Sequence, residues 1–266
     1  MESLAHQPLE PIQMLWVRGN LSRLERLSVN SFLANGHPVH LYTYEPGANI
    51  PKGVQVKEAK EIVPANLAPL SPVAPFAGGS MGAFSDCFRY HLLHDLGGWW
   101  ADMDIVCLRA WRFPEGPLTA ATTEVGHGRV ANTCVMRFPA KHPLMAACRS
   151  AFRTLDVRKA NISQTGPILL QTKMTELGYD DLRTDPAVFC PVPWNAGWQL
   201  WRPLWRRFTL DEVKQRVRRP HLSMRFTANT VAVHLWHETW RSARMDKEQQ
   251  LSRSCLYERL QRRWNR

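Results

Sequence analysis

Apolar and polar positions follow two different rhythms along the chain, and each rhythm predicts its own type of element. Continuous runs of apolar, β-prone residues predict buried strands, whereas apolar residues three or four positions apart predict amphipathic helices. The apolar runs at 12–17 and 39–44 flank a helical pattern over about 21–34, which ends at Asn35-Gly36. A strand, a helix and a strand of these lengths predict a βαβ unit and a parallel sheet, whose ligands bind at the carboxyl ends of the strands.

The stretch 97–104 reads Gly-Gly-Trp-Trp-Ala-Asp-Met-Asp and follows a helical pattern over 80–96. Glycine is typical of a helix end, and the β-prone run at 105–108 predicts a strand after the carboxylates. In an extended segment the side chains alternate faces, so Asp102 and Asp104 are expected to point the same way. Two carboxylates on one face at a strand end predict half of a site for a hard divalent cation.

The helix before this stretch carries polar residues where a buried face would have apolar ones. Ser85, Asp86 and Arg89 are three or four positions apart, so they share one side of the helix. A surface ion pair is the commoner arrangement for such residues. The alternative interpretation places them beside Asp102 and Asp104, where they hold a sugar or a phosphate.

The rest of the chain continues the alternation of strands and helices. Strands are predicted at 118–123, 133–138, 188–190 and 231–236, and helices at 142–155, 168–177, about 210–218 and about 246–263. Prolines and glycines over 63–82 predict a loop, which lacks the Gly-Lys-Ser/Thr of a phosphate-binding P-loop. The pattern therefore predicts an α/β chain.

The late strand ends in a segment with two imidazoles and a carboxylate, from His234, His237 and Glu238. Their spacing does not fit the His-Glu-x-x-His motif of helical zinc proteases. A single histidine at the end of a buried strand is more often a hydrogen-bonded core residue. Together with an upstream Asp-x-Asp pair, however, His234 suits the role of third ligand to Mn²⁺ or Mg²⁺.

Composition excludes some classes of protein. The 266 residues are 44% hydrophobic and 21% charged, which is typical of one large globular domain, with or without an appended subdomain. No run of 18 apolar residues occurs, and the N-terminus lacks a signal-peptide pattern, so a cytoplasmic protein is expected. The six cysteines form no Cys-x-x-Cys pair, which predicts reduced, buried thiols and argues against structural zinc.

The net charge of +11 lies mostly at the end of the chain. Residues 200–266 hold 16 lysines and arginines against 6 acidic residues, a balance of +10. Such a region can bind anionic lipid headgroups, nucleic acid or phosphorylated ligands, or form a solvated face. Nucleic acid is the weaker alternative, because the chain has no recognisable nucleic-acid motif and its tryptophans do not alternate with basic residues.

One known family shares the most specific of these patterns. Ser85-Asp86-x-x-Arg89-Tyr90, followed by Gly97-Gly98-x-Trp100-x-Asp102-x-Asp104, resembles the DXD-motif sugar transferases of glycosyltransferase family 32. Trp100 stands where the family usually has tyrosine, which keeps an aromatic ring and removes a hydroxyl.

Weaker similarities extend along the chain. Trp16-Val17 resembles a first-strand aromatic that stacks on the base, and Asn132 resembles an amide that contacts the donor. Thr165-Gly166-Pro167 resembles a recurrent helix start, and Trp240 resembles a tryptophan that closes over the diphosphate. His237-Glu238 stands where the family often has serine or asparagine near the metal.

The resemblance implies a GT-A-type fold, an α/β architecture with a Rossmann-like mixed sheet flanked by helices, in a single domain over 1–266. Residues 1–138 would bind the nucleotide-sugar and the metal. Residues 139–266 would form the acceptor side, with the basic, helical C-terminus.

The resemblance also implies roles for individual residues. Asp104 would ligate Mn²⁺ or Mg²⁺ directly, and Asp102 would do so through water or hold the ribose. The third ligand would be His234, or else His237 or Glu238. A second set of residues would hold the substrate. Arg89 and Asp86 would bind the sugar hydroxyls, and Trp16 and Val17 would contact the base. The other members of this substrate-binding set are Ser85, Trp100, Asn132 and Trp240.

The implied activity is transfer, with retention at the anomeric carbon, of a hexose or N-acetylhexosamine from a nucleotide-sugar. UDP is favoured over GDP, and the acceptor would be a glycan, a lipid-linked sugar or a protein, as in bacterial capsular or other surface-polysaccharide synthesis. The basic region could hold the enzyme on the inner face of the membrane. A non-catalytic nucleotide- or sugar-binding module and a basic nucleic-acid-binding protein remain as alternatives.

Overall fold

A computed structural model of the chain describes residues 7–68, 81–124, 128–152, 162–203 and 223–265. Its centre is a six-stranded sheet in the order β5-β3-β1-β6-β9-β8. The strands are β1 (Ile12–Leu15), β3 (Val39–Thr43), β5 (Val54–Glu58), β6 (Gly98–Ala101), β8 (Leu118–Glu124) and β9 (Gly128–Phe138). Strands β5, β3, β1 and β6 are parallel, whereas β9 is antiparallel to both β6 and β8. The α/β class and the Rossmann-like mixed sheet are therefore confirmed.

Helices and short ribbons surround this sheet. The helices are α1 (Arg23–Ala34), α2 (Met81–Asp95), α3 (Pro143–Ala151), α4 (Ile162–Thr165), α5 (Pro167–Leu177), α6 (Pro186–Phe189), α8 (His237–Ser242) and α9 (Leu256–Trp264), with 3₁₀ turns at Ala59–Glu61, Asp180–Leu182 and Trp194–Leu200. A parallel pair joins β2 (Arg18–Gly19) to β4 (Glu45–Pro46), and an antiparallel pair joins β7 (Ile105–Cys107) to β10 (Ala232–His234).

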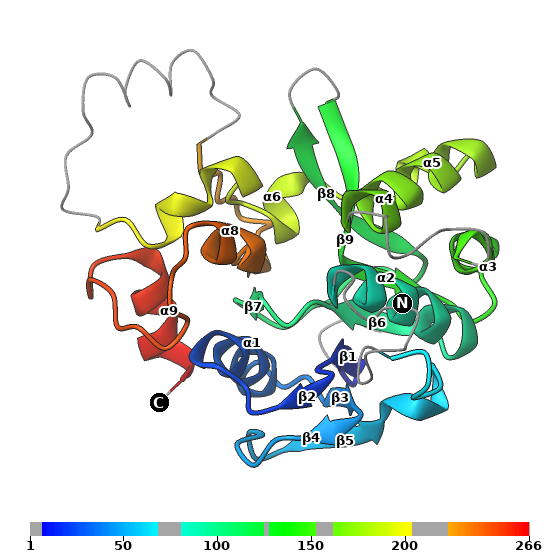
Figure 1. Ribbon diagram of the computed structural model, residues 1–266. Coiled ribbons are helices and arrows are strands. Elements are labelled where there is room, and N and C mark those ends of the chain that lie inside the picture. The colour runs from blue at the N-terminus through cyan, green and yellow to red at the C-terminus, as the bar shows by residue number, and fades with distance from the viewer. Residues whose placement is uncertain (1–6, 69–80, 125–127, 153–161, 204–222, 266) are drawn as a thin grey trace.

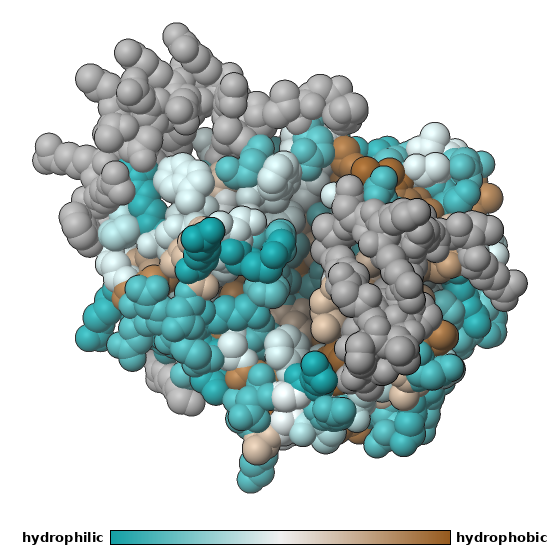
Figure 2. Space-filling model, viewed as in Figure 1, coloured by the Kyte–Doolittle hydropathy of each residue, from teal (hydrophilic) through white to brown (hydrophobic). Residues whose placement is uncertain are grey.

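The sheet has a hydrophobic core on each face. Side chains alternate along a strand, so Ile12 and Met14 of β1 face one core while Leu15 faces the other. The adjacent Trp99 and Trp100 of β6 separate in the same way. Helix α1 covers the first face and α9 packs against α1, whereas α2 and α5 cover the second face and α3 packs against both of them (Figure 1). On the side of the molecule seen in Figure 2, the coloured surface is mostly hydrophilic, with smaller hydrophobic patches.

The predicted βαβ unit is present, because local sequence and packing agree there. Ser22 begins α1 with a capping box, in which Glu25 Oε2 accepts from the Ser22 backbone N–H at 2.9 Å. The Leu24 N–H donates to Ser22 Oγ at 3.2 Å. Leu24, Leu27 and Phe32 are fully buried against the sheet. Strand β3 then pairs in parallel with β1.

Three predicted elements differ in the structure. The predicted strand at 188–190 is the end of α6, because Pro186 occupies the first turn and Asp185 caps it by accepting from the Ala187 N–H at 2.9 Å. The predicted helix at 246–263 begins only at Leu256, where Cys255 is the cap. Strand β9 begins at Gly128, five residues before the predicted start. The predicted helix at 210–218 lies outside the described residues.

The helix-to-strand junction before the Asp-x-Asp pair depends on Gly97. Its φ is +68°, a left-handed conformation that favours glycine. A Cβ at this position would lie 2.5 Å from the Ala140 backbone nitrogen. The tight passage lets α2 end directly against the start of β6. In the described part of the chain, no helix has the length and apolarity needed to cross a membrane.

Candidate functional site

Asp102 and Asp104 lie at the carboxyl end of β6, in the turn that leads to β7. The Ile105 N–H donates to the Asp102 carbonyl at 3.1 Å and closes this turn. The expectation that the two residues belong to an extended strand is therefore wrong. They lie close together because the chain turns, and the expected position at a strand end is confirmed. The turn keeps both side chains partly accessible, with 24% of the Asp102 side chain and 10% of the Asp104 side chain exposed.

Asp104 is anchored through one of its two oxygens. Its Oδ2 accepts from the His237 backbone N–H at 2.8 Å and lies 3.2 Å from His234 Nε2. Burial alone would raise the pKa of Asp104, but the His234 imidazole and the His237 N–H together hold it well below the usual range. The same pairing raises the pKa of His234 although burial lowers it. Asp104 is therefore a carboxylate.

Asp102 is anchored in the same manner from the other side. Its Oδ1 accepts from Trp100 Nε1 at 2.9 Å and lies 3.1 Å from Arg89 Nη2. Burial raises the pKa of Asp102, and the Arg89 charge opposes this rise. The Arg89 guanidinium also lies over the Trp100 ring, 4.9 Å from its centroid. Trp100 thus supplies an N–H to the carboxylate at the position where the resembling family has a tyrosine.

Arg89 and Asp86 do not form a surface ion pair, because they are only 4% and 1% exposed. Arg89 donates to the Thr133 carbonyl at 2.6 Å and to Ser85 Oγ at 2.9 Å. Asp86 lies 3.4 Å from Arg89 Nε and accepts from Thr165 Oγ1 at 2.7 Å. Burial raises the pKa of Asp86 to about 6, even though Arg89 and Thr165 lower it. The alternative interpretation, which places this helix face beside the Asp-x-Asp pair, agrees with the structure.

The structure brings some of the other predicted residues to this edge of the sheet. Trp16 and Val17 directly follow β1, whose carboxyl end adjoins that of β6 because the two strands are parallel neighbours. Trp16 is partly exposed, and its indole N–H donates to the Gly19 carbonyl at 2.9 Å. Val17 is buried. Asn132 on β9 is partly buried, and its Oδ1 accepts from the Cys134 N–H at 2.9 Å.

Trp240 is a core residue in this structure. Its side chain is 0% exposed, and its indole N–H donates to the Leu235 carbonyl at 2.9 Å. Its ring packs against Trp201 and Tyr257. The structure therefore does not bring Trp240 into contact with a site open to substrate.

The donor set fits a hard divalent cation. Among the described residues, Oδ2 of Asp102 and Oδ1 of Asp104 accept no hydrogen bond, so each carboxylate keeps one oxygen for a ligand. One ligand atom from each of Asp102, Asp104 and His234 lies within 4.8 Å of the others. His237 is exposed and contributes its backbone N–H, and Glu238 forms an ion pair with Arg241. Carboxylate oxygens are the ligands that Mn²⁺ and Mg²⁺ prefer, and the His234 Nε2 is already engaged with Asp104 Oδ2.

Sequence reasoning missed two groups near this site. Thr133 and Thr165 hold Asp86 through their hydroxyls, at 3.4 and 2.7 Å. Cys134 and Cys190 lie on the far side of the His234 ring from Asp104. Neither group has a local signal, because a lone threonine or cysteine in an apolar run is ordinary core material.

Comparisons with known proteins give a distant likeness. No protein-family model matches the chain, and no curated protein is similar to it in sequence. Among solved structures the chain resembles the PaToxG glycosyltransferase, to which it is 13% identical in sequence. The match covers 82% of this chain and 86% of that one, with a TM-score of 0.44.

Two further structures are similar at the same level. The glycosyltransferase GlyE of Streptococcus pneumoniae shows 10% identity and a TM-score of 0.45, over 97% of this chain and 63% of that one. A transferase solved as a double cysteine-to-serine mutant shows 10% identity and a TM-score of 0.42, over 65% and 87%. Likeness at this level says nothing of the chemistry of this chain, which rests on its own side chains.

Proposed function

We propose that this chain is a divalent-metal-dependent glycosyltransferase that uses a nucleotide-sugar donor. The observation that carries the proposal is the pair Asp102 and Asp104, each anchored through one oxygen at the carboxyl end of a parallel strand. Ligands of α/β sheets bind at this edge. The resemblance of 80–108 to glycosyltransferase family 32 points to the same site and adds the sugar donor.

The chain's own residues would prepare this site before substrate arrives. Arg89 and Trp100 fix Asp102, while His234 and the His237 N–H fix Asp104, so neither carboxylate has to be ordered on binding. A bound Mn²⁺ or Mg²⁺ would neutralise the charge that develops on the leaving diphosphate. Trp16, at the end of β1, would stack on the base.

Asp86 fits a positioning role better than direct contact with the sugar. Its Oδ2 accepts from Thr165, and its Oδ1 faces Thr133 and Arg89, so both oxygens are engaged inside the protein. Asp86 is also unsuited to act as a nucleophile because it is enclosed. We therefore propose that transfer with retention proceeds by attack from the leaving-group face, with the diphosphate taking the proton of the acceptor hydroxyl.

The finer parts of the proposal rest on the resemblance. They are a UDP donor, a hexose or N-acetylhexosamine, and a glycan, lipid-linked or protein acceptor of surface-polysaccharide synthesis. They also include a donor-binding half over 1–138 and an acceptor-binding half over 139–266.

The test is nucleotide release from a panel of UDP- and GDP-sugars with Mn²⁺, followed by mass spectrometry of the products. Asp104→Asn should lose about 10²-fold or more of the activity, because the amide cannot replace the charge of the carboxylate. Asp95→Asn is the matched control, since it removes a paired carboxylate at the far end of α2.

Two outcomes would contradict the proposal. If no donor is turned over while one binds in calorimetry, the chain is a non-catalytic sugar- or nucleotide-binding module. If Asp104→Asn keeps full activity in a protein that unfolds at the wild-type temperature, the Asp-x-Asp pair is not the metal site.

A further inference from the structure

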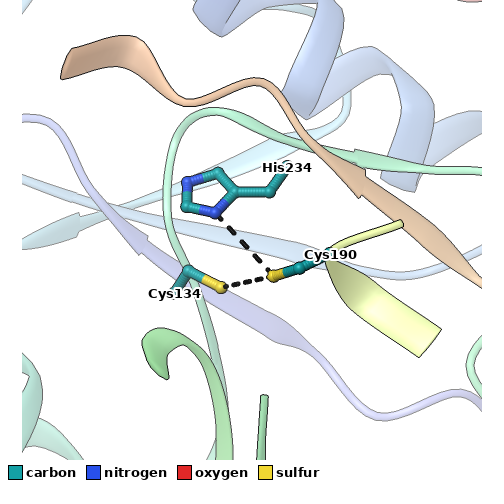
Figure 3. A group of neighbouring side chains, drawn as sticks. All are labelled: Cys134, Cys190 and His234. Carbon is teal, nitrogen blue, oxygen red and sulfur yellow. Dashed lines mark hydrogen bonds between the residues drawn. The ribbon is translucent and has the colours of Figure 1, made fainter. Parts of the chain in front are cut away.

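Two cysteines and a histidine converge behind the Asp-x-Asp pair. Cys134 lies on β9, Cys190 directly follows α6, and His234 ends β10 (Figure 3). The two Sγ atoms are 3.7 Å apart, and Cys190 Sγ is 3.9 Å from His234 Nδ1. One ligand atom from each residue lies within 4.8 Å of the other two, and all three residues are buried. Three segments that are far apart in sequence therefore direct two sulfurs and one nitrogen at a common point.

These two thiols differ in their partners from two other buried cysteines, Cys107 and Cys255. Cys107 Sγ donates to the Arg109 carbonyl at 3.1 Å, and Cys255 Sγ accepts from the Glu258 N–H at 3.5 Å. Within the described residues, the side chains of Cys134 and Cys190 make polar contacts only with each other and with His234. Two soft sulfur atoms and one imidazole nitrogen thus face one another without a backbone partner.

The separation of the sulfurs matches a tetrahedral metal site. Two thiolates bound to one zinc ion at about 2.3 Å each lie about 3.8 Å apart. A disulfide would need about 2.05 Å, so the observed 3.7 Å corresponds to free thiols at the spacing of zinc ligands.

The histidine is oriented as zinc-binding histidines usually are. Its Nε2 lies 3.2 Å from Asp104 Oδ2, and Asp104 is a carboxylate, so Nε2 carries the proton that joins them. The other nitrogen, Nδ1, faces the sulfurs. A metal-bound histidine typically donates its second ring N–H to a carboxylate, which fixes the ring and strengthens the metal bond.

We infer that Cys134, Cys190 and His234 Nδ1 form a binding site for zinc, separate in chemistry from the oxygen-rich site of Asp102 and Asp104. Zn²⁺ would displace the two thiol protons and the proton on Nδ1, all three of which leave to solvent, and a water would complete the four ligands. Two thiolates balance the charge of Zn²⁺, so the buried centre is neutral. Mn²⁺ and Mg²⁺ prefer oxygen ligands and would not compete here.

Such a site would tie β9, the end of α6 and β10 together directly behind Asp104. Because the ligands come together only in the folded chain, metal binding would stabilise the fold. The inference does not depend on the proposed glycosyltransferase activity, because its ligand atoms differ from those of the Asp-x-Asp site and the two sites share only the contact of His234 with Asp104.

The test is a titration of the metal-free, reduced full-length protein with Co²⁺, which replaces zinc and reports its ligands by absorption. We expect a sulfur-to-cobalt charge-transfer band in the near ultraviolet, visible bands of a tetrahedral ion, and loss of both on adding Zn²⁺. Cys134→Ser and Cys190→Ser should each lose these bands. Cys148→Ser, a buried cysteine outside the cluster, is the matched control and should keep them.

A folded wild-type protein that gives no charge-transfer band would overturn the inference, as would bands that persist in both cysteine variants. If those variants do not fold, X-ray absorption on the zinc-loaded wild type decides, because sulfur scatterers at about 2.3 Å support the site and a shell of only nitrogen and oxygen refutes it. Asp102→Asn should keep the cobalt bands while losing Mn²⁺-dependent nucleotide release, so the two proposals fail independently.

Discussion

At the scale of single residues, the candidate site depends on side chains that hold other side chains. Trp100 shows this most clearly, because it contacts two neighbouring side chains at once. Its Nε1–H donates to Asp102 at 2.9 Å while its ring supports the Arg89 guanidinium. Trp100 therefore combines a hydrogen-bond donor and an aromatic ring in one residue.

Trp100→Phe should weaken Mn²⁺ binding by about 10-fold or more, because Asp102 loses the donor that fixes it while Arg89 keeps an aromatic partner. The measurement is the free Mn²⁺ concentration by electron paramagnetic resonance. Trp99→Phe is the matched control, since the neighbouring indole faces the opposite core and touches neither carboxylate. Equal Mn²⁺ affinity in wild type and Trp100→Phe would contradict the assigned role.

Asp86 predicts a pH dependence of stability. Burial raises its pKa to about 6 in the folded protein, whereas an unfolded chain has about 3.9. Between about pH 4 and 6 the folded state keeps a proton that the unfolded state has lost, so this residue makes the protein less stable as pH rises through that window. Asp86→Asn lacks this titration.

The free energies of unfolding of wild type and Asp86→Asn should therefore differ most in their pH dependence. The free energy of unfolding of Asp86→Asn minus that of wild type should increase from pH 4 to 6 and stay constant above pH 6. Urea unfolding at several pH values measures it, and curves that stay parallel across the window would contradict the raised pKa.

At the scale of elements, one tight junction decides where the carboxylates lie. Helix α2 ends at Asp95, and Gly97 turns the chain so closely past Ala140 that β6 starts at once. Four residues later the strand ends and the Asp-x-Asp turn begins. The apolar pattern predicts this helix and this strand. It also predicts an extended chain after β6, because the alternation of side chains alone does not distinguish an extended segment from a turn.

Gly97→Ala should destabilise the protein by at least about 3 kcal/mol, because the new Cβ meets backbone atoms that cannot move aside. Gly178→Ala is the matched control. It has a similar φ of +73°, but a Cβ there meets nothing within 4 Å, so it should cost only about 1–2 kcal/mol of left-handed strain. Chemical denaturation compares them, and equal losses would show that the close approach at Gly97 is unimportant.

At the scale of the whole chain, most of the excess positive charge and the Asp-x-Asp pair lie in different parts of the sequence. The Asp-x-Asp pair lies at the middle of the chain, whereas residues 200–266 carry a balance of +10. Helix α9 belongs to this basic part and is held against α1 by the ion pair of Arg23 with Glu258 at 2.7 Å. A membrane-bound acceptor would place the basic region against anionic headgroups.

The protein should therefore float with anionic vesicles and not with neutral ones, and salt should weaken the binding because each exposed basic residue contributes about 1 kcal/mol that is screened. Flotation at low and high ionic strength measures this. No preference for anionic vesicles would contradict the membrane proposal, and a salt-sensitive shift with nucleic acid would favour the alternative that the sequence left open.

The sequence by itself determined the α/β class, the βαβ start and the short stretch that carries Asp102 and Asp104. These features are local, because helix and strand periods, the Ser22 cap and the glycine before β6 all act within a few residues. The tertiary structure alone decided how the carboxylates are held and which histidine faces them, since Trp100, Arg89 and His234 come from three elements. It also brought together Cys134 and Cys190, which are 56 positions apart. No spacing rule for metal ligands reaches across that distance, because only the packing of β9, α6 and β10 makes them neighbours.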